Sequence, residues 1–137
     1  MIDIALAIAK KAHAGQVDKA GVDYIQHPLY VASQVKTEQE KAVALLHDVI
    51  EDSDVTADDL LALGLSNEVV TAVQILTKKK GQSYQEYLEK VKSNNLARIV
   101  KLADLKHNSD LSRLKSVTNT DYERVKKYKN AIRYLST

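Results

Sequence analysis

The amino-acid sequence predicts an all-α fold, a compact bundle of roughly seven or eight helices. Hydrophobic residues recur at helical spacing, and no stretch longer than about four residues alternates between apolar and polar side chains as a half-buried strand does. Aromatic residues make up only 5% of the chain and all of them are Tyr, so the core has to be built from Leu, Ile, Val and Ala. One Pro and four Gly leave few helix breakers. The length of 137 residues suits a single domain, residues 1–137, with its own core.

The first half of the chain carries three predicted helices. Residues 2–14 form an amphipathic helical pattern, and the polar stretch 15–26 is expected to be a loop. Pro28 suits the first turn of the next helix, because an amide there needs no partner within the helix. Thr37, with a glutamate three residues on, is typical of a capping box, so we expect one continuous helix from residue 38 down to Asp52.

The second half of the chain repeats this pattern of small polar caps followed by apolar residues at helical spacing. Helices are expected over residues 57–63 after Thr56, from Ser66 through residue 76, from Ser83 through residue 91, from Asn94 or Asn95 onward, and over residues 121–135. The final helix is basic, and we interpret its charged side chains (Arg124, Lys126, Lys127, Lys129 and Arg133) as a solvated face.

Composition excludes several classes of protein. The chain has no cysteine, which excludes disulfides, thiolate metal sites and a cysteine nucleophile. The net charge of +2 is too small to indicate nucleic acid as a partner. No apolar run approaches the roughly 20 residues of a membrane span, and the N-terminus lacks the pattern of a signal peptide. We therefore expect a cytoplasmic protein with neither a membrane nor a nucleic acid as partner.

The stretch His47-Asp48-Val49-Ile50-Glu51-Asp52 gathers three carboxylates and one imidazole in an otherwise apolar segment. On a continuous helix His47 and Glu51 share one face, and so do Asp48 and Asp52. Such a concentration of negative charge is costly to fold unless a positive charge lies beside it. A divalent metal satisfies that requirement and can also activate water. The alternative is an acidic face that water solvates.

Two further segments carry polar side chains in unusual places. Asp104 lies between small and apolar residues, which predicts an inward carboxylate that needs a cation; the alternative is a surface ion pair with Lys101 or Lys106. His27 directly precedes Pro28, so its backbone is expected to be extended, which fixes the direction of the ring; the alternative is an ordinary turn histidine.

Together these segments resemble the HD-domain metal-dependent phosphohydrolases. Within that family they resemble the alarmone hydrolases, both the small enzymes and the hydrolase domain of the long synthetase/hydrolase enzymes. The resemblance rests on five motifs in this order: Ala12-His13-Ala14-Gly15-Gln16, Lys19-Ala20-Gly21-Val22-Asp23-Tyr24-Ile25-Gln26-His27-Pro28, His47-Asp48-Val49-Ile50-Glu51-Asp52, Thr77-Lys78, and Lys101-Leu102-Ala103-Asp104-Leu105-Lys106-His107-Asn108. No single motif would be specific, but the combination spans most of the chain.

The resemblance implies a site with assigned roles. The implied metal ligands are His27, His47, Asp48 and Asp104, and the implied metal is Mn²⁺. Glu51 and Asp52 match the acidic pair that positions and deprotonates the attacking water. Lys19 and Asn108 match positions that face the substrate, and Lys78 and Lys101 are further candidates to neutralise its phosphates; the alternative for each lysine is a solvated side chain. Tyr24 is interpreted as a packing residue.

The implied activity is removal of the 3′-pyrophosphate from guanosine 3′,5′-bis(diphosphate)-type nucleotides, with a small nucleotide as the partner. The sequence departs from the family at two positions: Asp18 stands where an Arg usually covers the guanine base, and Leu105 stands where the long enzymes usually carry Arg. An acid cannot stack on a base as a guanidinium does. Two alternatives therefore stay open: a phosphohydrolase of another phosphorylated nucleotide or cofactor, and a non-catalytic nucleotide-binding HD module.

Overall fold

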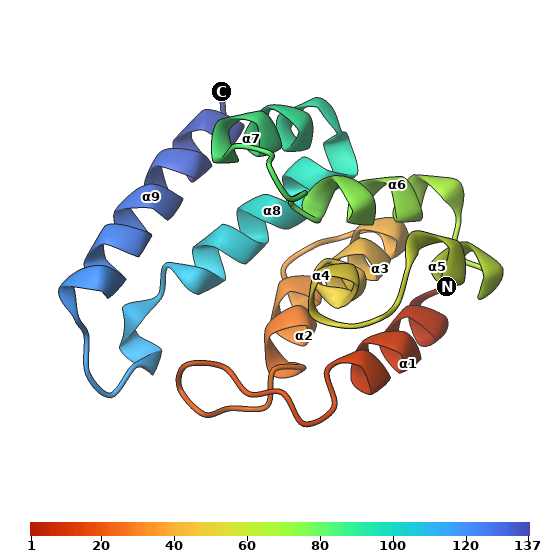
Figure 1. Cartoon of the computed structure of the whole chain (residues 1–137), viewed down its shortest axis with the longest axis horizontal. Coiled ribbons are helices and arrows are strands. Elements are labelled where there is room, and N and C mark those ends of the chain that lie inside the picture. Colours follow the sequence, from red (N-terminus) through yellow and green to blue (C-terminus); the bar gives the residue numbers. More distant parts are fainter.

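The computed structural model describes residues 1–137 and confirms the all-α fold (Figure 1). In chain order the elements are α1 (Ile2–Ala12), α2 (Gln26–Ser33), α3 (Glu38–Leu46), α4 (Val49–Asp52), α5 (Ala57–Ala62), α6 (Asn67–Leu76), α7 (Tyr84–Ser93), α8 (Asn95–Asn108), the 3₁₀ turn η1 (Leu111–Arg113) and α9 (Asn119–Leu135). No strand forms; Val17 and Asp23 make one isolated bridge in the loop after α1. None of the helices combines the length and apolar character that a bilayer span requires.

Most helices begin where local side chains cap them. Thr37, Thr56, Ser83 and Thr118 each form a capping box, in which the hydroxyl accepts from an amide three residues on and the acid at that position accepts from the cap amide. Each such exchange satisfies two amides that a helix start would otherwise leave without partners. The starts predicted at Thr37, Thr56 and Ser83 are thereby confirmed.

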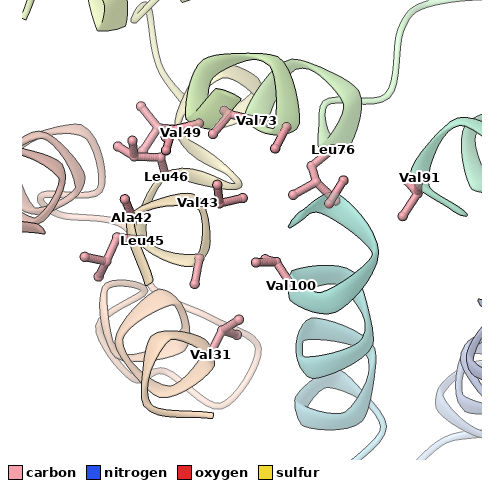
Figure 2. Close-up of a cluster of buried hydrophobic side chains, with 14 of the residues drawn as sticks. Val31, Ala42, Val43, Leu45, Leu46, Val49, Val73, Leu76, Val91 and Val100 are labelled. Carbon is pink, nitrogen blue, oxygen red and sulfur yellow. The ribbon is translucent and has the colours of Figure 1, made fainter. Parts of the chain in front are cut away.

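The core surrounds α3, which packs against α1, α2, α6 and α8. It is a cluster of 25 buried hydrophobic residues, and most of them are aliphatic, as the composition predicts. Figure 2 shows Val43 and Leu46 of α3 pointing toward Val73 of α6, with Val100 of α8 on the other side. This packing fixes α2, α3 and α8 relative to one another, and all three carry polar residues of interest.

Two backbone expectations were wrong. The helix predicted from residue 38 to Asp52 breaks at His47 and Asp48, so α3 ends at Leu46 and α4 is a separate short helix. At this break His47 Nδ1 donates to the Ala44 carbonyl at 2.5 Å, so a side chain satisfies one of the carbonyls at the end of α3.

The second wrong expectation concerns the backbone of His27. This residue lies inside the first turn of α2 and not in an extended segment before it. The amides of Gln26 and His27 bond back to the carbonyls of Asp23 and Tyr24, which draws the chain into a helical turn before Pro28. First-turn amides have no intrahelical acceptor, so Pro28 is tolerated there.

Candidate metal centre

Three buried side chains from three helices meet at one point. His27 of α2, His47 at the end of α3 and Asp104 of α8 each place one potential ligand atom within 4.8 Å of the other two. His27 Nε2 lies 2.7 Å from Asp104 Oδ1, and His47 Nε2 lies 3.4 Å from the same oxygen. All three residues are buried, although they are polar.

Asp48 adds a second carboxylate to this group. Its Oδ2 lies 3.0 Å from His47 Nε2 and 4.0 Å from His27 Nε2, and the Tyr24 hydroxyl donates to it at 2.5 Å. The four residues that the sequence singled out as ligands therefore converge, although they are separated by up to 77 positions in the chain. Tyr24, interpreted from the sequence as a packing residue, orients the Asp48 carboxylate.

The donor set suits a divalent cation. His47 Nδ1 faces the Ala44 carbonyl, which can only accept, so Nδ1 carries the proton and Nε2 is directed at the carboxylates. That buried Nε2 has no hydrogen-bond partner of acceptable geometry. A buried atom without a partner, beside two carboxylates and a second imidazole, is the arrangement that a cation would complete.

The charges at the site point the same way. Burial lowers the pKa of His47, but the nearby carboxylates of Asp48 and Asp104 outweigh burial and raise it well above the usual value. Burial raises the pKa of Asp48, but the neighbouring His47 charge outweighs it and lowers that pKa to about 2. Both carboxylates thus stay ionised, and in the absence of a metal the protonated His47 supplies the positive charge beside them, which a bound cation would replace.

His27 is oriented by a second histidine. His27 Nδ1 lies 2.7 Å from His107 Nδ1, and the two rings stack with an interplanar angle of 13°. Tyr30 stacks on the other face of His107. With one nitrogen engaged by His107, the other nitrogen of His27 is presented to Asp104 and the cluster.

The acidic pair of α4 lies beside the cluster. Burial, and then the charge of Asp48, raises the pKa of both Glu51 and Asp52. Glu51 lines a cavity together with His47 and Asp48, whereas Asp52 does not line it. Both side chains are exposed, and the break before α4 places them on a helix separate from that of His47.

Two cavities flank the cluster. The loop cavity, of about 320 Å³, lies between the α1–α2 loop, η1 and α9, and it reaches the cluster through Asn108, whose amide donates to Asp104 Oδ1 at 3.0 Å. The lysine cavity, of about 250 Å³, is lined by His47, Asp48 and Glu51 and by three lysines, Lys78, Lys101 and Lys127. Tyr128 lines both cavities.

The residues predicted to contact the substrate lie in different places around the cluster. Lys19 and Asn108 line the loop cavity, and Lys78 lines the lysine cavity. Lys101 is already engaged, because its Nζ lies 3.0 Å from Asp104 Oδ2. The two side chains are only 16% and 7% exposed, so this is a buried ion pair and not the surface pair considered from the sequence.

Asp18 has a structural task in the α1–α2 loop. Its carboxylate accepts from the amides of Ala20 and Val22, at 2.8 and 3.0 Å, and lies 3.6 Å from Nη1 of Arg113. It thus holds the loop in a turn and attaches η1 to it. An acid at this position brings a guanidinium into the loop cavity from another part of the chain.

Comparison with known proteins places this arrangement among relatives. No protein-family model matches the chain. The chain is 40% identical over 115 residues to a guanosine-3′,5′-bis(diphosphate) 3′-pyrophosphohydrolase of Haemophilus influenzae, covering 74% of this chain and 17% of that protein. It is 35% identical over 118 residues to the bifunctional (p)ppGpp synthase/hydrolase SpoT of Escherichia coli, covering 76% and 17%. The chain is related to the HD-domain alarmone hydrolases.

A solved structure supports the fold of this chain. A metazoan ortholog of SpoT, reported to hydrolyse ppGpp and to play a role in starvation responses, matches with a TM-score of 0.79 and 24% identity. The match covers 98% of this chain and 84% of the other. The chain spans only 17% of the length of these two curated bacterial relatives.

Several residues that line the two cavities were not predicted as site residues from the sequence. Arg124 and Lys127 were assigned to a solvated face of the last helix, and Arg113 and Tyr84 were not singled out. The available signal was that Arg124, Lys127 and Tyr128 lie three and four residues apart, which places them on one helix face. Which way that face points depends on how α9 packs against α7 and α8, and no local pattern reveals this.

Proposed function

We propose that this chain is a metal-dependent phosphohydrolase that removes the 3′-pyrophosphate from guanosine 3′,5′-bis(diphosphate)-type nucleotides. One observation carries the proposal: a buried His–His–Asp cluster, with the Asp48 carboxylate beside it, lies next to two cavities that basic residues line. The curated relatives bear the name of this activity, and the proposal transfers it to the part of those proteins that the chain matches. We further propose that residues 1–137 form one HD domain, since a single buried cluster links the helices from α1 to α9.

His27, His47, Asp48 and Asp104 would hold the cation. Two imidazole nitrogens and two carboxylates suit Mn²⁺, whose six-coordinate geometry would leave positions for water and a phosphate oxygen. When bound, the ion lowers the pKa of a water molecule and offsets charge on the phosphoryl oxygens.

Glu51 is the proposed general base, with Asp52 beside it to position the water. A carboxylate whose pKa is raised by burial and by Asp48 is a stronger base than one in free solution. In the proposed reaction Glu51 takes a proton from the attacking water, whose oxygen bonds to the phosphorus next to the ribose 3′ oxygen. The bond from that phosphorus to the 3′ oxygen breaks, the 3′ oxygen takes up a proton, and pyrophosphate departs.

The nucleoside would lie in the loop cavity, with Lys19 and Asn108 as its contacts. Asn108 links this cavity to the cluster, because its side-chain amide donates to Asp104 while the residue lines the cavity. Lys78 would face the phosphates, and Lys101 would add positive charge while it holds Asp104 in place.

A second candidate is hydrolysis of another phosphorylated nucleotide or cofactor. Asp18 supports it, because its carboxylate is bound to the loop and to Arg113 and offers no guanidinium for stacking on guanine.

The test is a panel of phosphorylated nucleotides assayed for pyrophosphate and phosphate release with Mn²⁺. We expect pyrophosphate release from the guanosine 3′-diphosphates, loss of both metal and turnover in His47→Ala, and retained metal with turnover lowered by about 100-fold or more in Glu51→Gln. Asp54→Asn is the matched control, since it removes a nearby exposed carboxylate and should change neither. Preference for a different nucleotide would favour the second candidate. Wild-type turnover by Glu51→Gln would exclude the proposed base.

A further inference from the structure

We propose that the lysine cavity binds the 3′-diphosphate of the substrate and the pyrophosphate product, and that Lys127 and the Tyr84 hydroxyl are its donors. The inference rests on the proposed function and extends it to two residues, from α9 and α7, that lie far from the cluster in sequence. It therefore gives the last helix a part in the site.

The Tyr84 hydroxyl is the first observation. It is buried, and no protein atom accepts from it or donates to it. Tyr84 nevertheless lines the lysine cavity. Its ring stacks with the Tyr87 ring, and the two ring centroids lie 6.0 Å apart. Leaving a buried hydroxyl without a partner costs about 1–3 kcal/mol, so a ligand oxygen that accepts from it would remove this cost.

Lys127 is the second observation. Its Nζ lies 4.0 Å from the centroid of the Tyr84 ring, and both residues line the lysine cavity. No carboxylate lies within ion-pair distance of Lys127 or of Lys78, whereas Asp104 neutralises Lys101 at 3.0 Å. Two uncompensated ammonium groups thus face one small cavity.

The lining of the cavity suits a diphosphate. It combines His47, Asp48 and Glu51, beside which the phosphorus under attack would lie, with the lysines Lys78 and Lys127 of other elements. A second phosphate, attached to the first, has to extend away from the cluster. A volume of about 250 Å³ leaves space for a diphosphate but little for a nucleoside beside it, which the larger loop cavity would take.

The cavity is lined by charges of both signs. Asp48 and Glu51 are its carboxylates, and Lys78 and Lys127 line it without an ion-pair partner. A polyanion without a bound cation would therefore be held by these two lysines. This allows the site to be tested without turnover.

The experiment is isothermal titration calorimetry of the full chain with inorganic pyrophosphate, in a chelating buffer and at one ionic strength. We expect Lys127→Gln to weaken binding by about tenfold, because a hydrogen bond to a charged group is lost. Lys127→Arg should retain most of the affinity. Tyr84→Phe should weaken binding by about threefold or more while leaving the melting temperature unchanged or raised, since the hydroxyl has no partner in the free protein.

Lys129→Gln is the matched control, because it removes the same charge from an exposed position of α9 outside this cavity. It should bind pyrophosphate within twofold of the wild type. Failure of the wild type to bind pyrophosphate, or equal weakening by Lys127→Gln and Lys129→Gln, would overturn the inference while leaving nucleotide hydrolysis open. Pyrophosphate binding that depends on Lys127 and Tyr84, in a protein that hydrolyses no nucleotide, would support the inference and reject the proposed function.

Discussion

Removal of the Asp104 carboxylate should destabilise the metal-free protein strongly, and for a specific reason. Asp104 bonds Lys101 at 3.0 Å, accepts from Asn108 at 3.0 Å and lies 2.7 Å from His27 Nε2. Asp104→Ala therefore leaves the Lys101 ammonium without its counter-ion in a site where the lysine side chain is only 16% exposed. The loss is one of charge compensation, because Asp104 contributes little apolar surface.

The magnitude follows from the burial of the pair. Breaking a buried ion pair from one side costs about 3–5 kcal/mol. Lys101 keeps some contact with water, and loss of Asp104 also relieves its repulsion of Asp48, so we expect the lower end, about 3 kcal/mol. For 137 residues the unfolding entropy near the transition is about 290 cal/mol/K, so this free energy lowers the melting temperature by about 10 °C.

The assay is urea and thermal denaturation in a chelating buffer at pH 7. The double variant Lys101→Met/Asp104→Ala is the control, and it should recover more than half of the loss because no ammonium is left unpaired. The Asp104 pKa lies well below its usual value: burial raises it, but the charge of Lys101 outweighs burial. A lowered pKa contributes stability above the unfolded value, near pH 4, which is lost as the pH falls through the folded value. A single variant within 1 kcal/mol of the wild type, or a double variant that recovers nothing, would refute the reasoning.

Three further predictions follow from contacts described above. His107→Phe keeps the stacking on His27 but removes its nitrogen partner, so metal affinity measured with an indicator dye should fall about tenfold, with His107→Asn closer to the wild type; equal losses would reject the orienting role. Asp18→Ala removes the carboxylate that holds the α1–α2 loop and Arg113, so hydrogen exchange at the loop amides should speed up about tenfold, and unchanged exchange would contradict this. Leu46→Ala leaves a cavity in the fully buried core, so urea denaturation should show a loss of about 2–5 kcal/mol in unfolding free energy, and a loss below 1 kcal/mol would mean that the core collapses around it.

Local signals made most of the fold predictable. The starts at Thr37 and Ser83 depend on residues three positions apart, so a single sequence contains all the information that they need. The break at His47 and Asp48 is different. Apolar residues at helical spacing continue through it, and the ring bond to the Ala44 carbonyl forms only where the ring is held in a buried cluster.

The site divides in the same way. The residues proposed as ligands have unusual surroundings in the sequence, such as Asp104 between apolar neighbours, and this drew attention to them. Lys127 lies among other basic residues of an amphipathic helix, and Asp18 and Arg113 meet across about 95 positions. These contacts depend on how α9 and η1 pack against the rest of the molecule. The spacing of residues along the chain does not reveal this packing.

The interruption between α3 and α4 has a consequence for attempts to make the protein more robust. On an uninterrupted rod, neighbouring residues point about 100° apart, so His47 and Asp48 would diverge. Here their side chains approach to 3.0 Å at the interruption between α3 and α4. Substitutions with high helix propensity at these two positions would remove the two polar side chains and favour one continuous helix. At His47 and Asp48, a substitution that raises the thermal stability should therefore lower the activity.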